Sequence, residues 1–339
     1  MGYRKIVRSL CMFTQRPSER AIERLRALAA RLRAADYVVQ TQRLCSPDID
    51  AVFDLDKRGE GSIFFSVGRQ ELEQAATMLE RFCAARNVAF NVEASVGQID
   101  DRHLGLLMTI IQKCAAKTFS FTFTFNNAVS SPYFPSATYD KEGFAIGLQP
   151  TDLSIGCTTV AEWLHRMQEA WIEIDSLMAA DEDYLGVDTS IASLGDGAGS
   201  FVDLVGRIGS RFEHAITSGV FLKIADFIKA PNTRHIGLCG LMFPCLEDFE
   251  LATEYERGAF SVERCTFLSL QSGLGLDAYP IAIDEVPTRI IEVLTLLQGL
   301  SNKHRKPLSA RFISDGIARM GQRTNLRSPF LQDVEVRAL

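Results

Sequence analysis

Two aspartates lie where short apolar strands are expected to end. Asp188 follows the apolar residues of LGVDTS (185–190), and Asp277 lies in GLGLDAYP (273–280). Acids at strand ends in an α/β core lie where loops converge and ligands bind. Two neighbouring carboxyl groups would have one raised pKa and one ionised partner, which suits a general acid and base. Each aspartate could instead cap the element that follows it, so both interpretations stay open.

A third acid, Glu247, closes the stretch GLCGLMFPCLED (237–248), in which five residues separate Cys239 from Cys245. This spacing is not C-x-x-C and does not predict a metal–thiolate site. We expect a strand and a tight turn leading into a helix whose first turn carries Glu247 and Asp248, because acids complement the helix dipole there. The functional alternative places Cys239 and one of these acids beside a ligand.

Arg311, in SARFIS (309–314), is expected in mid-strand, where an unpaired charge would be costly. It must meet a carboxylate. An ion pair with Asp277, Asp188 or Glu247 suits the guanidinium fork as well as an anionic substrate does. Further donors expected at this site are Gln271, Ser272, Gly273, Thr324 and Asn325. Of the histidines, His235 directly precedes the GLCG block and is the one expected near the site.

Other site types find little support in the sequence. No histidine–acid cluster indicates zinc, and LGDGAG (194–199) lacks both the P-loop lysine and the dinucleotide-binding fingerprint. No G-x-S-x-G elbow indicates a serine hydrolase. We therefore predict no cofactor, although an oxygen-ligated Mg²⁺ or Ca²⁺ stays open because carboxylate ligands leave no comparable signature.

Alternating strands and helices are expected to position these residues. Segments typical of strands lie at 3–13, 37–44, 62–67, 88–92, 143–149, 185–190 and 306–314. Segments with helical periodicity lie at 18–35, 70–85, 102–116, 158–178, 212–229 and 286–300. This alternation indicates an α/β layer architecture.

The segment TFSFTFTF (118–125) shows the cleanest period of two. Its phenylalanines, at 119, 121, 123 and 125, are expected on one face and need a core, while its hydroxyl face would suit a polar interior such as a barrel lumen, or solvent. The next segment (126–143) is rich in turn formers and predicts a long connection. Long ordered loops are uncommon without a functional reason.

The composition bounds the remaining possibilities. A chain of 339 residues with 47% hydrophobic residues can bury a large core. The net charge of −6, without a clustered basic face, argues against a nucleic-acid partner. No apolar run predicts a membrane span, and the basic N-terminus is interrupted before a signal-peptide core forms. Eight cysteines without close pairs suggest reduced thiols in a cytoplasmic protein.

Several blocks, in chain order, resemble a known family. They are SSPYFPSA (130–137), GLQ (147–149), LGVDTSIA (185–192), CGLMFPCLEDFELA (239–252), GLGLDAYPI (273–281), KPLSARFI (306–313) and MGQRTNLRSPFL (320–331). They look like the bacterial and archaeal family catalogued as domain of unknown function 711. The resemblance covers residues 120–337 and is weaker over the first hundred.

This resemblance implies a ten-stranded α/β barrel similar to the pyruvate formate-lyase-like fold of glycyl-radical enzymes. Radical chemistry is not expected, because Gly321 in ARMGQRT lacks the flanks of a radical glycine and Cys239 would have no initiator. We expect one α/β unit (1–339) with a less typical N-terminal section (1–97) and a barrel core (98–339).

The expected function is binding of a small polar metabolite, a carboxylate or an amino-acid-like compound, with acid/base chemistry on it. The catalytic candidates are Asp188, Asp277, Glu247 and Cys239, and the substrate-binding candidates are Arg311, Gln271, Ser272 and His235. The alternative is a non-catalytic metabolite-sensing or scaffold protein, because members of the resembled family are often encoded beside small amino-acid-sensing regulators. A homodimer is the expected assembly.

Overall fold

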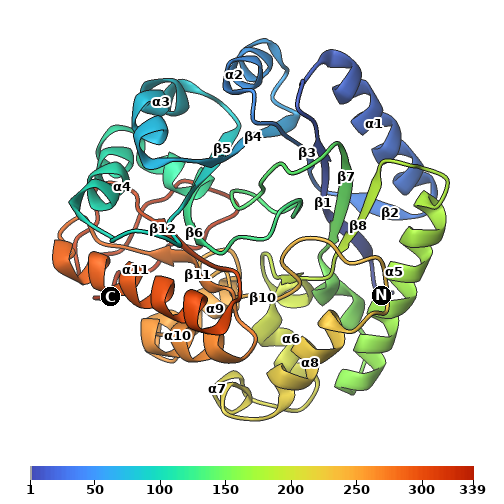
Figure 1. The fold of residues 1–339 in the computed structure, drawn as a ribbon. Helices are drawn as coiled ribbons and strands as arrows, with labels where there is room; N and C mark the ends of the chain where they lie inside the picture. The colour runs from blue at the N-terminus through green and yellow to red at the C-terminus, as the bar shows by residue number, and fades with distance from the viewer. Residues whose placement is uncertain (1) are drawn as a thin grey trace.

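Strands and helices alternate along the chain, and the helices lie around the outside of the strands (Figure 1). The computed structural model describes residues 2–339 and within them contains a ten-stranded mixed sheet, a two-stranded sheet and eleven α-helices. The strands are β1 (Lys5–Phe13), β2 (Tyr37–Val39), β3 (Gln42–Cys45), β4 (Ile63–Gln70), β5 (Val88–Glu93), β6 (Phe121–Phe125), β7 (Gly143–Leu148), β8 (Tyr184–Asp188), β9 (Ile191–Ala192), β10 (Leu241–Met242), β11 (Gly275–Pro280) and β12 (Leu308–Ile313). The α-helices are α1 (Glu19–Ala34), α2 (Ile49–Arg58), α3 (Leu72–Ala84), α4 (Asp101–Cys114), α5 (Val160–Met178), α6 (Phe201–Arg207), α7 (Phe212–Ile216), α8 (Val220–Lys229), α9 (Phe249–Glu256), α10 (Val262–Gln271) and α11 (Pro287–His304).

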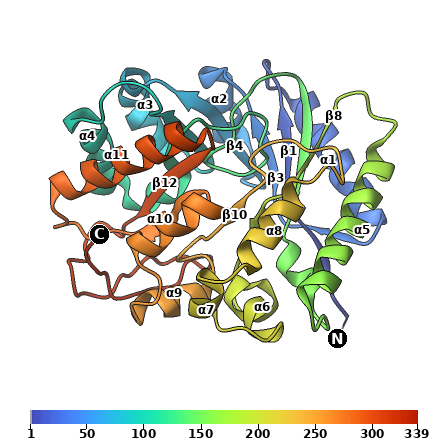
Figure 2. The same cartoon turned by 60° about the horizontal axis from the view of Figure 1, so that its bottom comes forward.

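The ten-stranded sheet combines groups of parallel strands that run in opposite directions. Strands β1, β3, β4, β5 and β6 lie side by side in this order and are parallel to one another. Strand β7 is parallel to β8, and β11 is parallel to β12. The groups meet through antiparallel pairs, β1 with β7 and β6 with β12. Figure 2 shows helices covering the outer side of these strands from a second direction. The predicted α/β architecture is confirmed.

The sheet is not closed into a barrel. Its hydrogen-bonded path runs from β11 to β8, and the separate pair of β9 and β10 is not part of it. Isolated parallel bridges join Val187 to His235 and Leu241 to Gly273. The segment 235–248, which holds the GLCGLMFPCLED stretch, therefore contacts both edges of the sheet through single bridges rather than continuous ladders. We call it the closing segment.

Local sequence explains where several elements begin and end. Helix α11 begins at Pro287, the predicted first helical position, where proline is well tolerated. The single helix expected over 212–229 is instead two helices, because Thr217–Ser218–Gly219 are poor helix formers and separate α7 from α8. Strand β6 begins at Phe121 rather than at Thr118, so Phe119 lies in a 3₁₀ turn (Ala115–Ser120). The other phenylalanines of β6 are buried in the main core as predicted.

The middle of the long connection 126–142 is largely buried, its two ends are partly exposed, and it is anchored to the sheet strands. The Asn91 side chain donates to the carbonyls of Pro135 and Ala137, at 3.0 Å each. The Tyr133 hydroxyl donates to the carbonyl of Leu148 at 2.8 Å. Gly147 has to be a glycine, because a Cβ there would lie 2.6 Å from the Tyr133 ring. The connection is thus a fixed part of the interior.

Cysteine chemistry differs from the prediction at one pair. Cys83 of α3 and Cys114 of α4 form a disulfide with a Cα–Cα distance of 5.5 Å, so the prediction of reduced thiols is wrong for them. The free cysteines are buried, apart from the half-buried Cys239. No helix within residues 2–339 has the length and apolar character needed to cross a bilayer.

Candidate functional site

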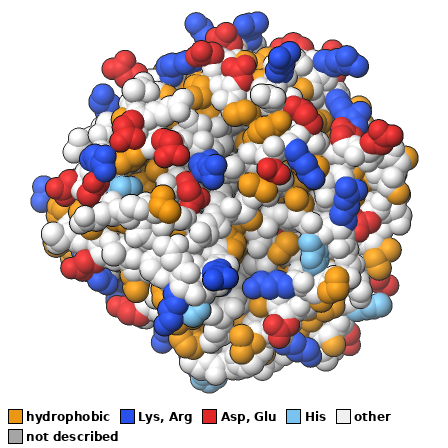
Figure 3. Space-filling view, viewed as in Figure 1, with side chains coloured by type: hydrophobic (Ala, Val, Ile, Leu, Met, Phe, Trp, Pro, Cys, Tyr) orange, Lys and Arg blue, Asp and Glu red, His pale blue; other side chains and the backbone are white. Residues whose placement is uncertain are grey.

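A cavity of about 370 Å³ lies between the inner faces of the strands, the connection 126–142 and the closing segment. Ligand pockets typically measure about 300–1,000 Å³. Side chains from β1, β3, β4, β5, β6, β11 and β12 line it. Ser120 and Thr122 are among them, so this part of the hydroxyl face predicted for 118–125 looks into the interior. Figure 3 shows basic and acidic side chains interspersed over one outer face of the molecule.

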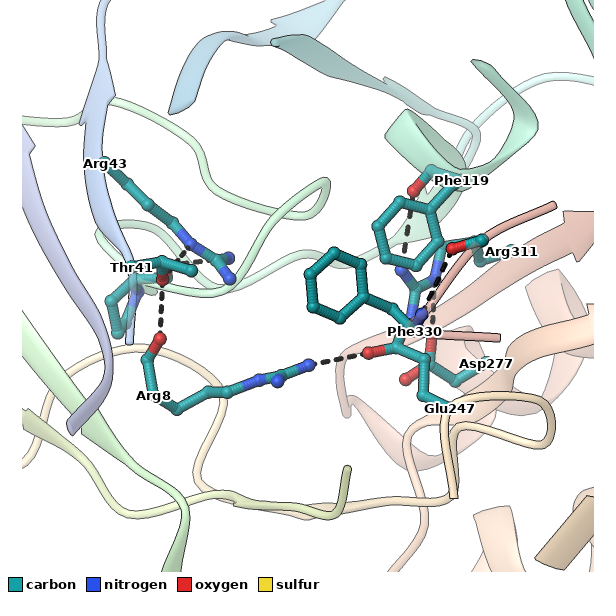
Figure 4. A network of polar contacts seen from close by, with 10 residues as sticks. Arg8, Thr41, Arg43, Phe119, Glu247, Asp277, Arg311 and Phe330 are labelled. Atoms are coloured by element: carbon teal, nitrogen blue, oxygen red, sulfur yellow. Dashed lines mark hydrogen bonds and ion pairs between the residues drawn. The ribbon is translucent and has the colours of Figure 1, made fainter. Parts of the chain in front are cut away.

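Arg311 is the centre of a buried ionic network (Figure 4). Its Nε donates to Asp277 Oδ1 at 2.7 Å, and its Nη2 pairs with Glu247 Oε1. Glu247 Oε2 in turn accepts from Arg8 at 2.6 Å. The side chains of Arg311 and Glu247 are only 7% and 4% exposed. The sequence argument that Arg311 must meet a carboxylate is therefore satisfied within the protein, by two carboxylates at once.

The two carboxyl groups of this network have pKa values displaced in opposite directions. Burial, which Arg311 only partly offsets, and the charge of Glu247 raise the pKa of Asp277. Burial also opposes the ionisation of Glu247, but the charges of Arg311 and Arg8 prevail and hold its pKa below the usual value. Glu247 is therefore the ionised member, and Asp277 is the member that takes up a proton more readily.

Arg43, on the neighbouring wall of the cavity, has no ion-pair partner among residues 2–339. Its Nε donates to Thr41 Oγ1 at 2.9 Å, and its guanidinium lies 5.0 Å from the centroid of the Phe134 ring. Burial, reinforced by the positive charge of Arg8, lowers the pKa of Arg43 to about 10. A half-buried guanidinium without an anion loses part of its hydration, and a ligand carboxylate would supply the missing charge.

Asp188 does not line the cavity, although it is completely buried. Its carboxylate accepts hydrogen bonds from the hydroxyls of Ser131 and Ser190 at 2.7 and 2.6 Å. It also accepts from the backbone N–H groups of Leu238 and Cys239, at 2.9 and 3.1 Å. Asp188 thus ties the closing segment to the connection 126–142. The catalytic role expected for it stays a prediction.

The turn around Asp188 accounts for a glycine of the closing segment. Gly237 has φ +79°, and a Cβ there would clash with the Asp188 carboxylate. Further along, Asp248 is the N-cap of α9 and accepts from the N–H of Leu251 at 3.2 Å. Glu247 and Asp248 therefore precede the first turn of the helix, where the sequence predicted them to lie within it. This shift leaves the Glu247 side chain free to reach Arg311.

The remaining candidates lie behind the cavity wall. Cys239 is absent from the lining, and burial, followed by the charge of Asp188, raises the pKa of its thiol to about 11. His235 contacts Asn232, and burial lowers its pKa. Gln271 and Ser272 follow one another at the end of α10, and the Gln271 Oε1 and Ser272 Oγ atoms are buried without hydrogen-bond partners. Of the eight candidates, the structure brings together Asp277, Glu247 and Arg311 at the cavity.

The sequence argument missed the arginines opposite Arg311. Arg8 interrupts the apolar strand KIVRSLCMF, and Arg43 lies in the short strand QRLC. Arg8 carries the signal that singled out Arg311, a charge within a mostly buried strand, whereas Arg43 follows the half-buried Gln42 in a strand of four residues. Phe119 and Phe330 also line the cavity, and neither lies on a regular strand or α-helix that a pattern could have indicated.

No group of three or more His, Cys, Asp or Glu side chains within residues 2–339 is arranged to hold a metal ion.

A comparison with curated proteins finds no match. The family model described as uncharacterised ACR (DUF711) matches residues 69–327, which is more than half of the 339-residue chain. Its match includes Asp277, Glu247 and Arg311 and excludes Arg8 and Arg43. The chain therefore belongs to the DUF711 family.

Proposed function

We propose that the protein binds a small carboxylate metabolite in the cavity and exchanges a proton with it. The observation that carries the proposal is Arg43, a half-buried cation that lines the cavity and has no ion-pair partner among the described residues. The lining as a whole is also cationic. It contains five basic side chains, Arg8, Arg43, Arg86, Lys117 and Arg311, against the acids Glu247 and Asp277. A carboxylate on Arg43 would form the two parallel hydrogen bonds that a guanidinium favours.

Asp277 is the acid/base group of the proposal. Its raised pKa brings it closer to the range in which a carboxyl group can both hold and release a proton. Glu247, whose pKa is lowered, stays ionised and positions Arg311 and Arg8. Opposed pKa directions in one site are typical of acid/base assignments. The reaction class is proton transfer at a carbon or heteroatom of a carboxylate held by Arg43.

The non-catalytic alternative also has an observation in its favour. Arg311 pairs with both acids of the cavity, Asp277 and Glu247, as in a structural ion-pair network. In that case the same cavity would sense the metabolite without converting it. Three further expectations stay proposals. The family resemblance implies a barrel, and the isolated bridges of the closing segment support it. The cysteine usage and the interrupted apolar run near the N-terminus suggest a cytoplasmic location, and a homodimer is the default assembly.

Arg43→Gln is expected to weaken the binding of carboxylates, because it removes the cation and leaves a shorter, neutral side chain. The measurement is native mass spectrometry of freshly purified protein, followed by calorimetric titration with propionate, pyruvate and succinate. We expect Kd to rise by at least about 30-fold, since a hydrogen bond to a charged group contributes about 1.5–3 kcal/mol and a second one adds to it. The matched control is Arg58→Gln, since Arg58 is 71% exposed and is not part of the lining. Equal carboxylate binding by both variants, or none by the wild type, would contradict the proposal.

The Asp277→Asn variant distinguishes the catalytic proposal from the sensing alternative. We expect this variant to bind the carboxylate that the wild type binds and to lose proton exchange, since an amide cannot take up the proton that the raised pKa of Asp277 allows. The measurement is incorporation of solvent deuterium into the ligand, followed by nuclear magnetic resonance in heavy water. Incorporation by the wild type but not by the variant supports catalysis. Its absence from the wild type, with binding intact, favours the sensor.

A further inference from the structure

Aromatic side chains line much of the cavity that the ionic network leaves free. They are Phe64, Phe119, Tyr133, Phe134, Phe243 and Phe330. Two of them lie against guanidinium groups, with Arg43 at 5.0 Å from the Phe134 centroid and Arg311 at 5.2 Å from the Phe119 centroid. A carboxylate bound by Arg43 would therefore lie beside an apolar wall. This wall would favour a ligand with an apolar body.

Phe330 is the most exposed of these rings, at 51%. It lies on an irregular segment that is held in place beside the network, because the Gln332 N–H donates to the Leu246 carbonyl at 2.9 Å. In Figure 4 the Phe330 ring projects between the Arg43 side and the Arg311 side of the cavity. An aromatic ring left uncovered on a cavity wall gains free energy when the apolar body of a ligand covers it.

Arg43 is the basic residue of the lining that can hold a carboxylate beside the aromatic wall. Arg8 and Arg311 already face Glu247 and Asp277. Lys117 and Arg86 donate to the backbone carbonyls of Arg86 and Gly59, at 2.9 and 3.0 Å, and these neutral acceptors leave their charges unpaired among the described residues. Arg43 differs from them because its guanidinium lies against Phe134, a ring of the lining.

The pairing of the acidic side chains with arginines argues against an ammonium group on the ligand. Such a group needs an anionic partner, and the acids of the lining, Glu247 and Asp277, are both engaged by arginines. An amino acid would therefore leave its ammonium group unpaired, whereas a carboxylic acid without an amine would not.

We infer that the ligand is a carboxylate with an apolar, ring-sized body and no ammonium group, and that Phe330 is a specificity-determining residue for that body. This inference rests on the proposed function, since it uses the Arg43 carboxylate site. It narrows the expected small polar or amino-acid-like metabolite to an aryl- or branched-alkyl carboxylate.

The test is calorimetric titration of the full-length protein with 3-phenylpropionate, propionate, succinate and phenylalanine. We expect 3-phenylpropionate to bind about 10- to 100-fold more tightly than propionate, the factor that burial of a ring-sized apolar group contributes. Phenylalanine, which adds only an ammonium group to the same ring and carboxylate, is expected to bind more weakly than 3-phenylpropionate. Succinate tests whether the cavity accepts a ligand with a second carboxylate group.

Phe330→Ala is expected to weaken 3-phenylpropionate binding by about 10-fold and to leave propionate binding unchanged. Phe330→Leu, which keeps an apolar side chain, is expected to restore part of the loss. The matched control is Ile317→Ala, because Ile317 is 71% exposed and outside the cavity lining. Thermal melting of all three variants checks that they fold.

The outcomes separate the inference from the function on which it rests. Tighter binding of succinate or phenylalanine than of 3-phenylpropionate, if lost in Arg43→Gln, overturns the inference and leaves the Arg43 site standing. Equal weakening of propionate and 3-phenylpropionate by Phe330→Ala removes the role of Phe330. Binding that survives Arg43→Gln, or no binding of any of the four compounds, defeats the proposed function and the inference together.

Discussion

Replacing Arg311 by methionine is expected to lower the free energy of unfolding by about 3–5 kcal/mol, the range observed when one partner of a buried ion pair is removed. Arg311 is 7% exposed and pairs with both Asp277 and Glu247. Without it, Glu247 keeps Arg8, but Asp277 loses its ion-pair partner. The measurement is urea denaturation at pH 7 followed by circular dichroism.

Two further variants check the cause of this loss. Adding Asp277→Asn to Arg311→Met is expected to recover part of the stability, because the uncompensated carboxylate is then gone. Arg323→Met is the matched control, since Arg323 pairs with Glu256 at 2.8 Å but is 57% exposed. Exposed pairs contribute about 0–1 kcal/mol. A loss in Arg311→Met no larger than in this control would show that the network does not stabilise the fold.

The second large effect is expected at Asp188. Asp188→Ala removes an acceptor that two hydroxyls and the N–H groups of Ser190, Leu238 and Cys239 share in a fully buried site. Each buried donor left without a partner costs about 1–3 kcal/mol, so we expect a loss of at least about 3 kcal/mol. Asp188→Asn keeps one acceptor oxygen and is expected to lose less.

Hydrogen exchange distinguishes this local cause from a general loss of stability. The amides of Leu238 and Cys239 donate directly to the Asp188 carboxylate. We expect them to exchange faster in Asp188→Ala than the amides of α1, measured by nuclear magnetic resonance at equal temperature. Unchanged protection at both amides, with the unfolding free energy intact, would refute the anchoring role of Asp188.

Sequence reasoning succeeded where one local physical rule determined the outcome. A charge within an apolar strand must be paired, and this rule predicted Asp277, Asp188, Glu247 or an anionic substrate as the partner of Arg311, of which Asp277 and Glu247 are partners in the structure. Applied evenly along the chain, the same rule would have found Arg8. The α/β alternation and the start of α11 at Pro287 also followed from local patterns.

Other features depend on contacts that no local pattern contains. Gln271 and Ser272 precede the strand of Asp277 by only a few residues, yet they end α10 and lie outside the cavity lining. Phe119 belongs to the period-two pattern of 118–125, but a 3₁₀ turn separates it from β6. Phe330 reaches the cavity on an irregular segment that is fixed by its contact with Leu246. The spacing of residues along the sequence does not show which of these side chains point into the cavity.

The pairing of β6 with β12 bears on how the protein is synthesised. Phe125 pairs with Leu308, so a ribosome must add more than half of the chain after β6 before that strand finds its partner. Until then the nascent chain carries an unpaired edge, and such edges promote aggregation. The residues of the cavity are also synthesised far apart in time, because Arg311 lies on β12 whereas Arg8 and Arg43 lie on β1 and β3, which are synthesised early. The cavity therefore becomes complete only after β12 has been made, long after the strands that carry Arg8 and Arg43.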